Sequence, residues 1–240
     1  MKKLYGLLVL LFINGLVFGQ KEFVLDANAS MRPITGRFSK IKISGPLKVY
    51  LSQSTEENLA ISASEEKFKE MIKTVVKNNV LHIYIEGGNK IWRNNINPKV
   101  YVSFKELNNL EISGASSVMN VGSIKGNELS VDISGACKLA ANIDVQELHI
   151  DISGASKAII SGSTNELFLE CSGASDFTSF DLVAQKARID ASGASDVAVK
   201  VTNTIQANAS GASRIYYKGN PPDTELKDSG ASKISAQNRK

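Results

Sequence analysis

The chain has 240 residues, 42% of them hydrophobic, with 28 Lys and Arg against 24 Asp and Glu, so its formal net charge is +4. This composition fits one or two globular domains and excludes a disordered tail, and 2 cysteines exclude a disulfide-stapled mini-protein. A net charge this small produces only a weak electrostatic field and gives no reason to expect nucleic-acid binding.

Residues 1–19 have the pattern of a secretory signal peptide. Lys2 and Lys3 precede an apolar run from Leu4 to Phe18, and small or apolar residues lead to a cleavage site after Gly19. The run is too short and interrupted for a membrane span, no other stretch reaches the roughly 18 apolar residues that a span requires, and no cysteine follows to carry a lipid anchor. We therefore expect an exported protein that is periplasmic, on the outer surface or extracellular.

Residues 20–106 are expected to form an N-terminal β region. Apolar and polar residues alternate from Ile41 to Leu51, and residues 59–64 repeat this pattern more weakly. A short helical turn is expected near residues 65–71, followed by a hairpin across Asn78-Asn79 into a strand over 80–85. A polar loop over 87–97 then leads to a strand over 100–104.

Trp92, the only tryptophan, lies in this polar loop between Lys90 and Arg93. An exposed aromatic ring beside hydrogen-bond donors suits recognition of a sugar or a protein surface. The ring could instead fold back over the end of the sheet as a plug. These three residues are therefore a candidate ligand-binding site, with the structural alternative left open.

Residues 107–240 contain a repeat. The tetrapeptide Ser-Gly-Ala-Ser, once Ser-Gly-Ala-Cys, occurs seven times at spacings of 18 to 21 residues, with its glycines at Gly114, Gly135, Gly154, Gly173, Gly193, Gly211 and Gly230. Seven copies at one narrow period indicate a stack of equivalent units.

Each unit is expected to consist of two strands joined by a bend at the glycine. Apolar residues alternate with polar ones before the glycine, another apolar residue follows four positions after it, and the missing Cβ permits the bend. Units of about 19 residues made only of strands and turns predict an all-β fold, a parallel β-helix or β-solenoid with coils stacked at about 4.8 Å. Parallel crossovers favour a right-handed solenoid.

The two ends of the solenoid differ in sequence from its middle. Ile41 to Leu51 share the phase of the repeats, so the N-terminal region is interpreted as a degenerate start of the same construction. At the other end Asp228 occupies a core position, Pro221-Pro222 interrupts the preceding linker, and residues 237–240 are polar. These features indicate a polar cap, which solenoids need because an open edge invites pairing with another chain.

Carboxylates recur three positions before the glycines, at Glu111, Asp132, Asp151, Glu170 and Asp190, and the series continues as Asn208 and Lys227. We call this series the acidic column, and expect it to point outward, with its charges repelling one another at about 4.8 Å. Asp132, Asp151 and Glu170 are candidate Ca²⁺ ligands. The alternative is a solvated face whose charge is offset by neighbouring bases. No other cofactor is expected.

Motifs for catalysis or zinc binding are missing from the sequence. The serine before each repeat glycine lacks the Gly-x-Ser-x-Gly setting and the histidine partner of a hydrolase, so its hydroxyl is expected to satisfy backbone groups at the bend. The histidines His82 and His149 and the two cysteines fit no zinc template. Cys137 and Cys171 belong to units two coils apart, about 10 Å along the axis, and are expected to remain free thiols.

Three further segments resemble a bacterial family of unknown function, the "putative autotransporter adhesin, head GIN domain" family. They are Phe38–Gly45 (FSKIKISG), Asn79–Ile85 (NVLHIYI) and the repeated Ile-Ser-Gly-Ala-Ser. The resemblance would cover residues 36–235 as one continuous domain. It implies a right-handed β-helical fold in an exported, often surface-associated protein, and it offers no catalytic residues.

These features favour a non-enzymatic, exported solenoid that presents a rigid surface for adhesion or cell-envelope binding. Its partner would be a surface glycan or an envelope protein, and a homo-oligomer is compatible with the pattern. The alternative is a carbohydrate-active enzyme of the parallel β-helix type that uses the acidic column as acid and base. Such enzymes need carboxylates that converge in a groove, whereas this column places one on each of successive coils.

Overall fold

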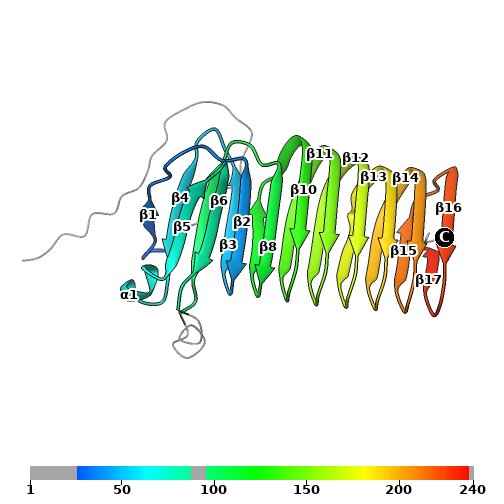
Figure 1. Cartoon of the computed structure of the whole chain (residues 1–240). Helices are drawn as coiled ribbons and strands as arrows, with labels where there is room; N and C mark the ends of the chain where they lie inside the picture. The colour runs from blue at the N-terminus through cyan, green and yellow to red at the C-terminus, as the bar shows by residue number, and fades with distance from the viewer. Residues whose placement is uncertain (1–25, 88–95, 238–240) are drawn as a thin grey trace, which may run out of the picture.

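Alternating apolar and polar residues fold this chain almost entirely into β-strands. The computed structural model describes residues 26–87 and 96–237. Its elements are β1 (Ser30–Arg32), β2 (Lys40–Gly45), β3 (Lys48–Gln53), β4 (Asn58–Ser62), α1 (Glu66–Lys69), β5 (Ile72–Lys77), β6 (Val80–Ile85), β7 (Lys99–Phe104), β8 (Asn109–Gly114), β9 (Ser117–Val121), β10 (Ile124–Ile133), β11 (Lys138–Ile152), β12 (Lys157–Cys171), β13 (Asp176–Ala191), β14 (Asp196–Ala209), β15 (Arg214–Lys218), β16 (Asp223–Asp228) and β17 (Lys233–Ala236). The 17 strands of the described residues belong to one hydrogen-bonded sheet, wound into a rod (Figure 1). The predicted signal peptide, residues 1–19, lies outside the described residues.

The coils from β10 onward stack in parallel, as the repeat predicts. Leu129 pairs with Leu148, which pairs in turn with Leu167 on the next coil. The two regions predicted to meet between residues 106 and 107 belong to one hydrogen-bonded sheet, because β2 in the N-terminal region pairs with β8 in the repeat region. The predicted all-β solenoid with coils of about 19 residues is confirmed.

The inward positions of the coils form one continuous core. Ile133, Ile152 and Cys171, each two residues before a repeat glycine, are no more than 1% exposed. Burying such an aliphatic side chain contributes about 1.5–3 kcal/mol relative to leaving it exposed. The core therefore stabilises each interior coil through its neighbours on both sides.

The repeat glycines form the predicted bends, with φ angles between 68° and 86°. They also meet another requirement, which is a close approach between coils. A Cβ added to Gly154 would lie 2.5 Å from the carbonyl oxygen of Gly135 on the preceding coil. The missing side chain thus permits both the left-handed backbone and the contact between stacked bends.

The serine two residues after the glycine makes the more regular hydrogen bonds at the bend. Ser213 Oγ donates to the carbonyl oxygens of Ser210 at 2.8 Å and Ala191 at 3.1 Å. Among the serines before the glycine, Ser113 Oγ donates to the carbonyl oxygen of Ile43 at 3.1 Å. The predicted use of hydroxyl groups at the bend is therefore correct, but the main position is two residues after the glycine.

The two cysteines are both buried, and neither forms a disulfide. Cys137 takes the place of the serine after the bend, and its Sγ accepts a hydrogen bond from the Ser116 amide at 3.4 Å. Cys171 points into the core beside Ile152, its partner in the parallel register. Both side chains therefore occupy the environments that the repeat phase predicts.

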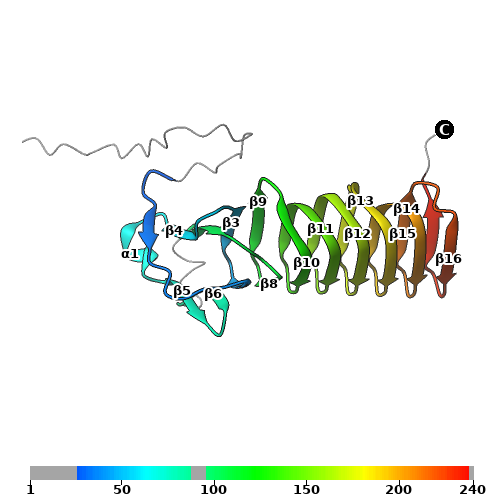
Figure 2. The same ribbon diagram turned by 90° about the horizontal axis from the view of Figure 1, so that it is seen from above.

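The N-terminal coils are stacked out of sequence order. β2 pairs in parallel with β6 on one side and with β8 on the other, and β3 lies in the same way between β7 and β9. The coil made by β2 and β3 is therefore enclosed between a later coil and the first repeat. Figure 1 shows β2 between β6 and β8, and Figure 2 shows β3 beside β9. Gly45 pairs with Gly114, so the shared phase of these two coils is confirmed.

The local elements of the N-terminal region follow the sequence with one correction. α1 is the predicted helical turn, and β5 and β6 form the predicted antiparallel hairpin, with Asn78 at φ 52° and Asn79 at φ 64°. The interpretation of residues 59–64 as a weak echo of the coil is wrong, because β4 is antiparallel to both β7 and β1. Its alternation serves an antiparallel sheet at the end of the rod.

The last coil is polar, as the sequence predicts. All six residues of β16 are exposed, and β17 is exposed or half-buried. Within residues 26–87 and 96–237, no helix has the length and hydropathy needed to cross a membrane.

Candidate binding face and groove

The acidic column lies on one outward face of the rod, as predicted. The parallel register places Glu111, Asp132, Asp151, Glu170, Asp190, Asn208 and Lys227 side by side on successive coils. Lys42 on β2 precedes Glu111 in the same column and forms an ion pair with it. A cationic side chain therefore stands at each end of the carboxylates.

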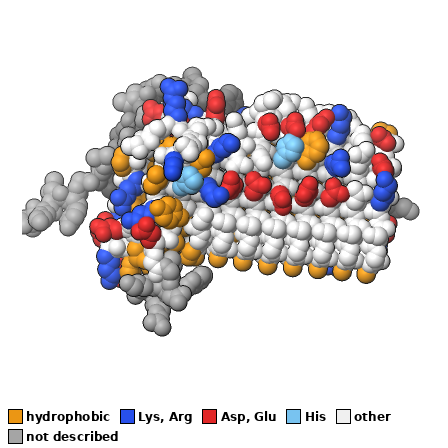
Figure 3. Space-filling model, in the orientation of Figure 1, with side chains coloured by type: hydrophobic (Ala, Val, Ile, Leu, Met, Phe, Trp, Pro, Cys, Tyr) orange, Lys and Arg blue, Asp and Glu red, His pale blue; other side chains and the backbone are white. Residues whose placement is uncertain are grey.

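Two further outward columns run beside the acidic column on the same strands. One contains Ser130, His149, Phe168, Arg188, Gln206 and Glu225, and the other contains Glu128, Glu147, Glu166, Lys186, Thr204 and Asp223. We call the surface formed by the three columns the acidic face. Figure 3 shows its red side chains in two rows, with pale blue and orange side chains between them.

An aromatic pair lies at the centre of the acidic face. The rings of His149 and Phe168 are stacked, with centroids 4.6 Å apart and planes only 6° from parallel. His149 Nε2 lies 2.7 Å from Oε1 of Glu147, and Lys186 Nζ donates to Glu166 at 2.9 Å. The half-buried, stacked rings thus form an aromatic patch with carboxylates on both sides.

This aromatic pair was missed by the sequence analysis, although its signal is present. His149 and Phe168 each lie five residues before a repeat glycine. Alignment on the glycines puts them in one outward column, where the parallel register then stacks them.

Mutual repulsion is visible in the electrostatics of the acidic column. Partial burial, and then the neighbouring charge of Asp132, raise the pKa of Asp151 above its usual value. Amide groups relieve the repulsion elsewhere in the column. Asn208 Nδ2 donates to Asp190 at 2.7 Å and Asn109 Nδ2 donates to Asp132 at 3.1 Å.

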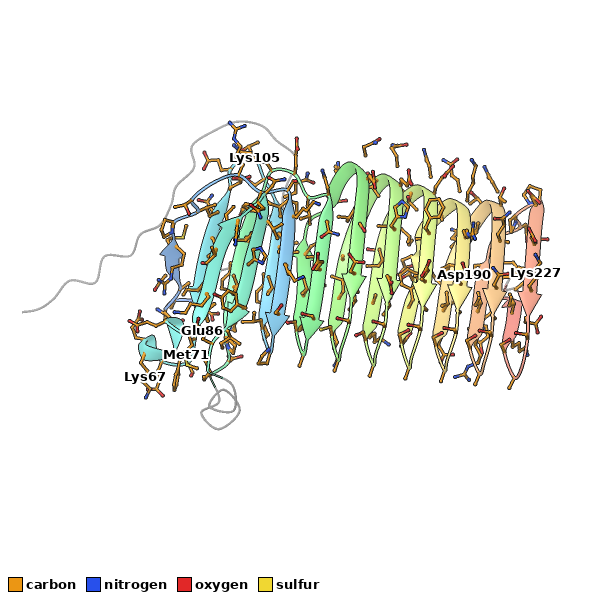
Figure 4. The ribbon with its side chains drawn as sticks, in the orientation of Figure 1. Lys67, Met71, Glu86, Lys105, Asp190 and Lys227 are labelled. Carbon is orange, nitrogen blue, oxygen red and sulfur yellow. The ribbon has the colours of Figure 1, made fainter. Side chains whose placement is uncertain are left out.

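A groove of about 420 Å³ follows the acidic column toward the C-terminal end. It is lined by carboxylates, hydroxyls, an amide and a lysine, which come from Asp151, Glu170, Asp190, Asn208, Lys227, Asp228 and the serines before the last four bends. Figure 4 shows Asp190 and Lys227 along this part of the rod. A long groove with polar groups of several kinds is suited to a linear, polar ligand.

The Ca²⁺ hypothesis gains no cluster of ligands from the structure. Among the described residues, no three His, Cys, Asp or Glu side chains are placed to hold a metal ion. Asp132, Asp151 and Glu170 lie side by side on parallel strands. Calcium binding stays a prediction, for which a rise in melting temperature with millimolar Ca²⁺ that Asp151→Asn abolishes would be the test.

The other predicted ligand site, Trp92 with Lys90 and Arg93, lies outside the described residues. The carbohydrate-active enzyme alternative gains no support from the groove. Apart from Asp228, its carboxylates project along one column, whereas glycosidases place two carboxyl groups on either side of the scissile bond.

Comparison with known proteins identifies the family. Residues 37–221 match the family described as "Putative auto-transporter adhesin, head GIN domain". The chain belongs to this family. The match includes both the N-terminal coils and most of the repeats, so the family unit extends across the change of pattern near residue 107. No curated protein sequence matches the chain.

Solved structures share the fold of this head GIN domain. A "putative adhesin" from Bacteroides fragilis has a TM-score of 0.81 at 22% identity, covering 88% of this chain and 98% of its own. A "putative lipid binding protein" from Parabacteroides distasonis has a TM-score of 0.64 at 22% identity, covering 90% and 98%. A "putative adhesin" from Parabacteroides merdae has a TM-score of 0.65 at 17% identity, again covering 90% and 98%. At these identities the likeness shows the fold alone.

Proposed function

We propose that this chain is an exported, non-enzymatic adhesion protein that binds a surface glycan through the acidic face and its groove. The stacked His149 and Phe168 rings between carboxylate columns carry the proposal. Because the two stacked rings cover each other's inner faces, their edges and outer faces are the parts that can contact the apolar CH groups of a sugar, while carboxylates accept hydrogen bonds from its hydroxyl groups. Membership of an adhesin family supports an adhesion-type role.

The regular spacing of the coils favours a linear ligand. Carboxylates, serines and an amide recur along the groove from Asp151 to Asp228 at about 4.8 Å per coil. A polymer that follows the rod would meet acceptors and donors repeatedly. The rigid stacking of coils also means that few groups need to be ordered when the ligand binds, which favours affinity.

Glycan-array screening of the mature protein, followed by calorimetry with the strongest ligand, tests the proposal. Phe168→Ala should weaken binding about tenfold or more, as truncation of a central aromatic contact does. Phe180→Ala is a matched control, because Phe180 is also a half-buried ring but lies on β13, away from the acidic face, with Lys218 over its ring. Absence of any glycan ligand would refute the proposal, and equal affinities for wild type and Phe168→Ala would refute the site.

The proposed export is tested separately. Fractionation of the native host should recover the protein outside the cytoplasm, with an N-terminus near Gln20. Recovery of the full-length chain in the cytoplasm would contradict this part of the proposal.

A further inference from the structure

Both ends of the rod present strands with an unpaired edge. At the N-terminal end β5 pairs with β6 alone, and at the C-terminal end β16 pairs with β14 alone, among the described residues. One continuous series of paired strands connects β5 with β16. It begins with the antiparallel pair of β5 and β6 and continues in parallel through β2, β8 and the second halves of β10 to β14 to β16. An unpaired edge is a template for another strand.

Exposed apolar side chains accompany these edges. Val75 on β5 is 48% exposed and Leu226 on β16 is 38% exposed. Leu226 continues the inward column of Ile189 and Ala207, but no further coil covers it. A groove of about 440 Å³ also runs along β5, lined by Arg32, Pro33, Glu70, Ile72, Lys73, Thr74 and Val75.

The two edge strands carry opposite charge. β5 contains Lys73 and Lys77, whereas β16 contains Asp223, Glu225 and Asp228 with the single base Lys227. Lys77 is exposed and makes no ion pair with a described residue, whereas Lys73 pairs with Glu86 at 3.5 Å and Glu225 pairs with Lys227 at 2.5 Å. β5 and β16 are therefore complementary in charge, whereas β1 and β17, the other edge strand at each end, each carry one base, Arg32 and Lys233.

We propose that copies of this chain associate end to end, with β16 of one copy pairing with β5 of the next. Because β5 is antiparallel to the strands of the solenoid, the new pair is antiparallel as well. We obtain the register of β16 against β5 by continuing each column of side chains in a straight line from one copy into the next. Leu226 then lies against Val76, which extends the core column of Leu81, and Glu225 lies opposite Lys77.

Charge on the edges selects this mode over association of like ends. Two β16 strands would bring Asp223, Glu225 and Asp228 against the same carboxylates, and two β5 strands would oppose lysine to lysine. Like charges directly opposite each other in a sheet are destabilising. A head-to-tail contact does not close on itself, so it produces open filaments rather than dimers. This inference does not depend on the proposed glycan binding.

Sedimentation velocity over a concentration series tests the proposal. The wild-type sedimentation coefficient should rise continuously with concentration, past that of a dimer. Lys77→Glu and Glu225→Lys should each abolish the rise, and both substitutions in one chain should restore it, because the charges are exchanged. Lys105→Glu and Glu56→Lys, which change exposed residues away from the edge strands, are the matched controls and should leave the rise intact.

Cysteine cross-linking tests the register independently. A mixture of Lys77→Cys and Glu225→Cys chains should form mixed disulfides faster than either variant alone forms its own. Circular dichroism of each variant confirms that the coil stack is intact. The proposal is overturned if folded wild type stays monomeric at all concentrations, if association stops at a dimer, or if the exchanged pair fails to associate.

Discussion

Replacing Gly154 with alanine tests the stacked bends that define this solenoid. Gly154 has a φ of 75°, and an added Cβ would lie 2.5 Å from the carbonyl oxygen of Gly135, 3.0 Å from its nitrogen and 3.2 Å from its carbonyl carbon. That oxygen cannot move freely, because it accepts a 2.8 Å hydrogen bond from the Ala155 amide. The substitution therefore strains the backbone and pushes two coils apart.

The expected loss of stability has two parts. The left-handed backbone costs an alanine about 1–2 kcal/mol, partly offset by the lower entropy of the unfolded chain, roughly 0.4–1 kcal/mol. Moving the oxygen out of contact weakens the hydrogen bond that it accepts from the Ala155 amide, which costs about 0.5–1.5 kcal/mol. We expect a total loss of about 1–3 kcal/mol, or a fall in melting temperature of roughly 2–12 °C for a domain of this size.

Gly122→Ala is the matched control. Gly122 has a φ of 80°, but an added Cβ would meet nothing within 4 Å, so only the backbone strain applies and the loss should be about 1 kcal/mol. Equilibrium denaturation followed by circular dichroism measures both variants. Equal losses of stability would refute the close approach of stacked bends, and with it the register of coils around Gly154.

Asp151→Asn should raise the free energy of unfolding at pH 7 by up to about 1 kcal/mol, a modest gain because the group is exposed. Burial and the charge of Asp132 raise the folded-state pKa of Asp151, so the ionised carboxylate opposes folding above that pKa. The gain in stability from Asp151→Asn should therefore disappear as the pH falls through the folded-state pKa. Equal stability of variant and wild type at pH 7 would contradict this. Maleimide without reductant should label Cys137 and Cys171 only after unfolding, because burial raises the pKa of both thiols, that of Cys171 to about 12; an intramolecular disulfide would contradict the stacking register. Trp92→Ala should leave stability unchanged while weakening attachment to the ligand; a loss of ~3–5 kcal/mol would instead indicate a buried plug.

The repeated part of the fold could be predicted because residues that pair between neighbouring coils of a solenoid are separated by a nearly constant number of positions in the sequence. Once the glycines are aligned, every residue at one offset shares one environment. The inward place of Cys171 and the outward place of Asp151 follow from counting residues. The structure confirms both positions, since Cys171 is 1% exposed and Asp151 pairs with Asp132 and Glu170 in the outward column.

The order of the N-terminal coils could not be predicted in this way. Alternation at Ile41 to Leu51 specifies strands with a buried face, but any coil of the same shape can cover that face. The hairpin at Asn78-Asn79 and the helical turn at Phe68 send the chain to the end of the rod before it returns to residue 109. The order in which the N-terminal coils stack depends on the segments that connect them, and the sequences of these segments do not repeat.

Binding specificity in this fold must come from outward positions, because the stacking rules leave them free. Inward positions need apolar side chains of limited volume, and the bends need glycine. The outward column of Ser130, His149, Phe168 and Arg188 has no such constraint, and its members change chemical class from coil to coil. The parallel register still holds these unlike side chains side by side. An aromatic platform such as His149 and Phe168 can therefore arise on this rod by substitution at two equivalent offsets, without any change in the core.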